Sequence, residues 1–164
     1  MEIFQSRRLS VEKNLYTFPN GVRREKIVVK PADAVAVLPI VGDECCLIRQ
    51  YRFAIGEYIL EAPAGTMNPG ENPQATAHRE LIEETGLSAG LLISHGFIYT
   101  TPGFTTERIF LFEARDLAPS HEFAPDEDEV IEVHNVRTDA IPQMIRDGRI
   151  VDAKTICLCY RCFG

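Results

Sequence analysis

The sequence lacks a long apolar run, a secretory leader and an excess of basic residues. Its longest apolar stretch, residues 34–41, is too short to span a bilayer and is interrupted by Pro39. The first five residues, Met-Glu-Ile-Phe-Gln, do not follow the basic-then-apolar layout of a secretory signal. We therefore expect a cytoplasmic protein that makes no membrane contact.

Basic residues are outnumbered, with 17 Lys and Arg against 24 Asp and Glu and a net charge of −7. This balance argues against a broad clamp on the phosphate backbone of nucleic acid, so no nucleic-acid partner is expected. An acidic protein can still bind a phosphorylated small molecule if divalent cations neutralise the charge. The chain has 164 residues, 45% of them hydrophobic, which is enough for one domain with a full core.

The five cysteines are an odd number, in a chain too large to depend on disulfides for its stability. Three of them form the pattern Cys157-x-Cys159-x-x-Cys162, with no histidine near them in the sequence. We expect reduced, mostly buried cysteines near a C-terminal helix, because free cysteine packs as a small hydrophobic side chain. A low-affinity metal site is the alternative interpretation.

Strand signals dominate both ends of the sequence, and helical signals appear in the middle and at the C-terminus. Asn20-Gly21 joins two strand-like segments, 15–18 and 22–30, and this dipeptide is a strong hairpin signal. Further strands are expected over 34–38, 45–48, 58–60, 96–100, 107–114 and 130–136, and C-terminal helices over 140–147 and 153–162. This order predicts an α+β or mixed α/β sandwich.

The clearest helix lies between Asn72, which can cap its start, and Gly86, which can terminate it. Glu80, Glu83 and Glu84 lie at i, i+3 and i+4 on this helix, so their carboxylates project from one face and repel one another. Near the helix C-terminus the macrodipole disfavours anions as well. Local stability does not explain the cluster, whereas Mg²⁺ prefers such oxygen donors, so we interpret it as a functional site rather than a solvated acidic face.

The residues around this cluster form a longer pattern with fixed spacing. It reads Gly65-x5-Glu71-x7-Arg79-Glu80-Leu81-Ile82-Glu83-Glu84-Thr85-Gly86-Leu87. The chain resembles the Nudix hydrolase family at every specified position of that family's signature. The resemblance implies an α/β/α sandwich with a mixed β-sheet and cleavage of a nucleoside diphosphate linked to another group. It also implies Mg²⁺ as cofactor, two or three ions per site, with Mn²⁺ as an alternative.

Site residues follow from the same resemblance. Glu80, Glu83 and Glu84 match the metal ligands, Arg79 would hold Glu83 in position, and Glu71 would be a supporting carboxylate. Sequence outside the signature is similar to the ADP-ribose pyrophosphatase branch of the family, and that similarity covers about three-quarters of the chain. The segments that carry it are 49–52, 56–57, 60–65, 102–103, 107–108 and 148–155.

The branch resemblance adds further expectations. The carbonyl of Ala64 would be another metal ligand. Arg52 would contact the substrate's phosphates or terminal ribose, and the alternative is that Arg52 forms only a surface ion pair. Glu57 and Glu107 would help to shape the site, although for Glu107 we favour a role in orienting its loop. The catalytic base would come from the acidic segment 126–129, with Glu129 as first choice and Glu127 as the alternative, unless the segment is simply a hydrated loop.

The predicted reaction is the Mg²⁺-dependent hydrolysis of ADP-ribose to AMP and ribose 5-phosphate. Two alternatives stay open: a hydrolase acting on a broader range of nucleoside diphosphate sugars or other nucleotides, and a Nudix-fold sensor that binds ADP-ribose without cleaving it. Residues 1–32 are expected to form an N-terminal strand region used for dimerisation, and residues 33–164 the Nudix domain. In such a homodimer, Arg23 or Arg24 would lend charge to the neighbouring site.

Overall fold

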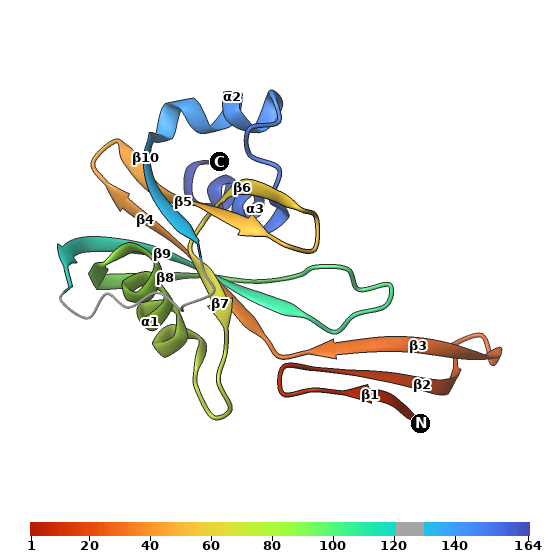
Figure 1. Ribbon diagram of the computed structural model, residues 1–164. Helices are drawn as coiled ribbons and strands as arrows, with labels where there is room; N and C mark the ends of the chain where they lie inside the picture. The colour runs from red at the N-terminus through yellow and green to blue at the C-terminus, as the bar shows by residue number, and fades with distance from the viewer. Residues whose placement is uncertain (121–129) are drawn as a thin grey trace.

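A computed structural model describes residues 1–120 and 130–164. Two β-sheets follow one another along the chain, and three α-helices pack against the second sheet (Figure 1). The first sheet pairs its strands antiparallel in chain order. Its members are β1 (Glu2–Gln5), β2 (Leu9–Thr17) and β3 (Arg23–Pro31).

The second sheet is mixed and has the strand order β10-β5-β4-β9-β8, with β6 paired to β5 and β7 paired to β4. The pairing of β4 with β9 is parallel, and the others are antiparallel. Its strands are β4 (Ala34–Val41), β5 (Glu44–Arg52), β6 (Glu57–Glu61), β7 (Ala64–Thr66), β8 (Leu87–Tyr99), β9 (Arg108–Pro119) and β10 (Ile131–Arg137).

Helices lie on both faces of the second sheet (Figure 1). The strand β4 shows how its sequence supports this arrangement, because it is buried on both sides and its side chains alternate between two cores. Val35 and Val37 pack with Leu81 of α1, whereas Ala36 and Leu38 pack with Leu158 of α3. The helical segments are α1 (Pro73–Thr85), a 3-10 turn (Thr138–Ala140), α2 (Ile141–Arg146) and α3 (Ala153–Phe163).

This architecture confirms the predicted α/β/α sandwich and the N-terminal hairpin. The predicted helix is also confirmed: the side chain of Asn72 accepts a hydrogen bond from the Ala75 amide, and Gly86 closes the helix at φ 70°. The sequence misses the short strands β1 and β7. The strand predicted over 96–100 begins nine residues too late. The observed β8 starts at Leu87, because Leu87 and Leu92 pack against the core under α1.

The five cysteines are all free thiols. Burial raises the pKa of Cys45 and Cys46 to about 11, so both thiols stay protonated and unreactive near neutral pH. Among the described residues, no helix is long and apolar enough to cross a membrane.

Candidate functional site

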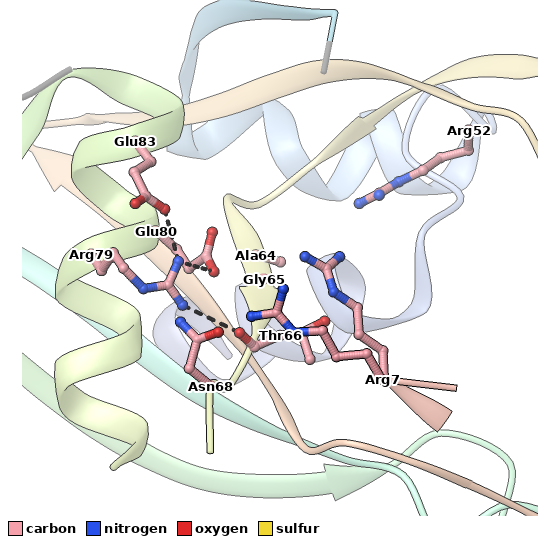
Figure 2. A pocket seen from close by; sticks show the side chains of 10 residues that line it. Arg7, Arg52, Ala64, Gly65, Thr66, Asn68, Arg79, Glu80 and Glu83 are labelled. Atoms are coloured by element: carbon pink, nitrogen blue, oxygen red, sulfur yellow. Dashed lines mark hydrogen bonds and ion pairs between the residues drawn. The ribbon is translucent and has the colours of Figure 1, made fainter. Parts of the chain in front are cut away.

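The acidic side of α1 faces β7, and Arg79 lies at its centre (Figure 2). Its guanidinium Nη1 donates to Glu80 at 2.6 Å and to Glu83 at 2.7 Å. Its Nε and Nη2 donate to the two carboxylate oxygens of Glu71 at 3.1 and 3.2 Å, and Nη2 also reaches the Thr66 carbonyl. One cation therefore bridges three carboxylates that would otherwise repel one another.

The pKa values follow from these contacts. The hydrogen bonds to Glu71 raise the pKa of Arg79 above its ordinary value despite partial burial, so this side chain stays charged. The same pair lowers the pKa of Glu71 from 4.5 to about 2. At neutral pH the site therefore holds Glu71 as a carboxylate locked to Arg79, as the sequence led us to expect for a supporting group.

The strand β7 approaches α1 closely from the other side. Glu84 is almost fully buried, and its Oε2 accepts a hydrogen bond from the Ala64 amide at 2.8 Å. Gly65 lies directly against Glu80, so closely that a Cβ at this position would overlap the Glu80 carboxylate. Glycine at this position lets the backbone approach the carboxylate, and a larger residue would displace the end of the Glu80 side chain.

These residues fit a hard divalent cation. Glu71, Glu80, Glu83 and Glu84 together with one guanidinium carry a net charge of −3 (four carboxylates and one Arg). Oxygen donors with excess negative charge are the ligands that Mg²⁺ prefers, and the ion keeps room for water and substrate phosphates. The structure thus brings Glu80, Glu83, Glu84 and Ala64, the four predicted ligand positions, to one junction between α1 and β7.

A cavity of about 380 Å³ opens beside this junction (Figure 2). Its lining is strongly polar and combines guanidinium groups on one side with carboxylates on the other. The lining residues are Arg7, Arg8, Arg52, Ala64, Gly65, Thr66, Asn68, Arg79, Glu80 and Glu83. Such a wall suits a ligand that carries negative charge and is bridged to the carboxylates by cations.

Arg52 lines this cavity and also forms an ion pair, so both interpretations of it describe part of its environment. Its Nε and Nη2 donate to the two oxygens of Glu61 at 2.6 and 2.7 Å. Glu61 is 1% exposed and also pairs with Lys154, at the start of α3. Burial alone would raise the pKa of Glu61, but Arg52 and Lys154 outweigh it and hold this pKa below its usual value.

Three other predicted residues lie outside this cavity. Glu57 lines a separate hollow that it shares with Arg49 and His134. Glu107 accepts a hydrogen bond from Thr100 Oγ1 at 2.7 Å, which links the two ends of the loop between β8 and β9, and its loop-orienting role stays a prediction. Arg24 is exposed on β3, with a hydrogen bond to the neighbouring carbonyl of Arg23.

Sequence reasoning missed Arg7 and Arg8, which belong to the turn between β1 and β2 and project into the cavity. Both are exposed, and among the described residues neither guanidinium has a hydrogen-bond or ion-pair partner. The signal that could have found them is an arginine pair in an acidic chain, although only the fold places that turn beside β7. The predicted bases Glu129 and Glu127 lie outside the described residues.

A carboxylate-rich helix turn lies between a strand and an arginine-lined cavity in an α/β/α sandwich, an arrangement that suits an anion bridged to the protein by divalent cations. The family model of the NUDIX domain matches residues 30–159 of the sequence, so the chain belongs to the NUDIX family. This confirms the resemblance that the signature indicated.

Individual relatives support the same branch. The chain is 35% identical over 156 residues to an ADP-ribose pyrophosphatase of Bacillus subtilis, which covers 94% of this chain and 84% of that protein. It is 34% identical over 157 residues to a methanol dehydrogenase activator of Bacillus methanolicus, with 94% and 85% covered. A crystal structure of an ADP compounds hydrolase superposes with a TM-score of 0.88 at 28% identity, covering 99% of this chain and 88% of that one. The prediction of a Nudix pyrophosphohydrolase is confirmed by these matches.

Gly65→Ala should weaken Mg²⁺ binding, because the added methyl group would push the Glu80 carboxylate out of its place. We expect a loss of more than about tenfold, as for other changes that misorient metal ligands. Isothermal titration with Mg²⁺ measures it. The matched control is Gly103→Ala, where a Cβ would meet nothing within 4 Å. Equal affinity in the two variants would show that the close approach of Gly65 is unimportant.

Glu71→Gln should destabilise the protein at neutral pH, and the difference from the wild type should shrink in acid. A folded-state pKa lowered from 4.5 to about 2 contributes stability above pH 4.5, and this contribution is lost as the pH falls toward 2. Urea unfolding at pH 7, 5 and 3 measures the difference. Glu25→Gln, which removes an exposed pair with Lys13, is the control and should change little at any pH. A pH-independent difference for Glu71→Gln would contradict the assignment.

Proposed function

We propose that the protein hydrolyses the pyrophosphate bond of ADP-ribose, with water, to AMP and ribose 5-phosphate. The observation that carries this proposal is the meeting of the α1 carboxylates with an arginine-lined cavity. The similarity to proteins named ADP-ribose pyrophosphatase and ADP compounds hydrolase supports the choice of substrate.

Each group has a defined task in this reaction. Glu80, Glu83, Glu84 and the Ala64 carbonyl would hold Mg²⁺, which when bound neutralises the pyrophosphate and lowers the pKa of the attacking water. Arg79 fixes the orientation of Glu80 and Glu83 through its Nη1. Since these glutamates would be occupied as ligands, we assign the general base to Glu129, with Glu127 as the alternative.

The arginines across the cavity would bind the substrate. Arg52 is oriented by its two hydrogen bonds to Glu61, which hold its guanidinium at the cavity wall. Arg7 and Arg8, which carry no partner among the described residues, are free to pair with phosphate oxygens. A cytoplasmic location stays a prediction from the sequence.

Two variants separate the roles of ligand and base. Glu83→Gln should weaken Mg²⁺ binding and hydrolysis together by more than about tenfold. Glu129→Gln should slow hydrolysis by about 10²–10⁴-fold with Mg²⁺ binding nearly intact. Steady-state hydrolysis and Mg²⁺ titration measure both. Equal loss of Mg²⁺ affinity in the two variants would reject this division of roles.

A substrate panel tests the specificity of the same reaction. It compares ADP-ribose with other nucleoside diphosphate sugars, a dinucleotide and a nucleoside triphosphate, each with product analysis. We expect the highest kcat/KM for ADP-ribose. Much faster turnover of another nucleotide would show that ADP-ribose is not the preferred substrate. Tight binding of ADP-ribose without turnover would indicate a sensor.

We also propose that residues 1–32 join two copies into a homodimer and that residues 33–164 form the catalytic domain. The strand register supports this proposal, because directly paired residues lie on one face of a sheet. Phe4, Val11 and Val29 form one row of the first sheet, and Leu15 and Ile27 continue the same face. Phe4, Leu15 and Ile27 are each more than half exposed, so this face presents open apolar side chains beside the exposed Lys13–Glu25 ion pair.

Light scattering at micromolar concentration should give the mass of a dimer. The double variant Phe4→Glu with Ile27→Glu should give a monomer, since it places charges on the apolar face. Lys26→Glu, on the opposite face of β3, is the control and should stay dimeric. A monomeric wild type, or a dimeric double variant, would remove this role of the first sheet and with it any contribution of Arg24 to a neighbouring site.

A further inference from the structure

Three side chains with metal-binding chemistry meet on the face of the second sheet that α3 covers, away from the α1 carboxylates. They are His95 of β8, Glu113 of β9 and Cys162 near the end of α3. Their ligand atoms all lie within 4.8 Å of one another. Nε2 of His95 is 3.2 Å from Glu113 Oε2 and 3.8 Å from Cys162 Sγ.

Glu113 is an exception in its own strand. It continues the row formed by Ile109 and Leu111, which faces the core under α3, yet it is a carboxylate with a side chain only 9% exposed. Burying a carboxylate is costly unless charges and hydrogen bonds satisfy it. Such a residue in an apolar row indicates a specific role.

The irregularity in β8 brings His95 to the same place. The register of β8 against β9 shifts between Ser94 and Phe97, so that His95 and Gly96 lie together opposite Leu111. Gly96 has φ 76°, and Arg161 of α3 donates to the carbonyl of His95. Bulges of this kind re-aim side chains, and here the local backbone is anchored to α3.

The geometry does not suit a proton relay of the kind that activates a cysteine nucleophile. In such a relay the two nitrogens of the imidazole contact different partners, one the nucleophile and the other the orienting carboxylate. Here the contacts with Cys162 and Glu113 are both made by Nε2. Three groups that converge on one point are instead what a metal ion requires.

The separations agree with a tetrahedral zinc ion. Zn–S of ~2.3 Å and Zn–N or Zn–O of ~2.0–2.2 Å place neighbouring ligand atoms roughly 3.3–3.6 Å apart. The observed 3.2 and 3.8 Å differ from this range by only a few tenths of an ångström. Imidazole, carboxylate and thiolate are also the three ligand types that zinc uses in proteins.

The charges agree as well. A carboxylate and a thiolate together neutralise a divalent ion, and the thiol proton leaves to solvent when the metal binds. Arg115 donates from Nε to the other oxygen of Glu113, Oε1, at 2.5 Å, and so fixes the carboxylate while Oε2 points at the cluster. An outer hydrogen bond of this type orients a metal-binding carboxylate.

We infer that His95, Glu113 and Cys162 form a second metal site, which binds Zn²⁺ with three protein ligands and a water molecule in the fourth position. The ion ties the last turn of α3 to β8 and β9. The alternative of a metal site in the pattern Cys157-x-Cys159-x-x-Cys162 is thereby changed to a site with one of these cysteines. Cys159 packs into the core, and within residues 1–120 and 130–164 only Cys162 contacts a histidine.

The experiment uses Co²⁺ as a coloured probe for the full-length protein, stripped of metals and kept in excess Mg²⁺ to occupy the α1 carboxylates. We expect one equivalent of Co²⁺ to give a sulfur-to-cobalt charge-transfer band in the near ultraviolet. Zn²⁺ should displace the Co²⁺ and abolish the band. Oxygen ligands alone give no such band, so the α1 site does not contribute to it.

Three variants locate the site. Cys162→Ser should abolish the band and weaken Zn²⁺ binding by about 100-fold or more, and His95→Gln should weaken Zn²⁺ binding to a similar degree. Cys157→Ser, on the same helix but outside the cluster, is the matched control and should keep both properties. Circular dichroism and the Tm of the metal-free variants verify that they fold, and Zn²⁺ should raise the Tm of the wild type but not that of Cys162→Ser.

Absence of the charge-transfer band in the wild type would overturn the proposal and leave a hydrogen-bonded polar cluster only. So would wild-type Zn²⁺ affinity in Cys162→Ser and His95→Gln, or loss of the band in Cys157→Ser. None of these measurements uses hydrolysis of ADP-ribose, so their outcome is independent of the proposed function.

Discussion

The ion pairs of Arg79 are the interaction on which the acidic side of α1 depends. Two unit charges about 4 Å apart interact by about 4 kcal/mol at an effective dielectric constant near 20, so adjacent carboxylates would distort a helix turn if nothing lay between them. Arg79 lies between them, touching Glu71, Glu80 and Glu83, and its guanidinium has the fixed fork geometry that can hold several carboxylates at once. Because of Arg79, this helix turn can remain helical while it carries an excess of negative charge.

The side of the site opposite α1 is formed by the backbone of β7 and not by charged side chains. Strand β7 is only three residues long, yet its pairing with β4 aligns Gly65 against Glu80 and the Ala64 amide against Glu84. Since β4 is the central strand and is buried on both faces, this wall is anchored in the core of the fold. The cation-binding junction therefore combines a charged helix face with a close backbone approach.

The sequence predicts those parts of the fold that depend on neighbouring residues. Asn72 and Gly86 define α1 correctly because a cap and a left-handed terminator act within one helix turn, and the fixed spacing of the carboxylates indicates a family. Contacts between segments that lie far apart in the chain could not be predicted from the sequence. The approach of the turn holding Arg7 and Arg8 to β7 depends on how the first sheet meets the second. Likewise, His95 and Cys162 are 67 residues apart in the chain and meet only because a bulge and a helix end coincide.

The buried carboxylate of Glu61 links α3 to Arg52 at the wall of the arginine-lined cavity. Lys154 and Arg52 both compensate its charge, and the hydroxyl of Thr155 accepts the amide hydrogen of Ala62 next to it. Removal of the Lys154 side chain alone would leave all four carboxylates of the signature and the whole of α1 in place. It would nevertheless take away one of the two cations beside Glu61 and leave the full charge of that carboxylate to Arg52. A change in α3, far from the signature in the sequence, would thus alter the charge on the arginine side of the cavity without touching the cation-binding helix.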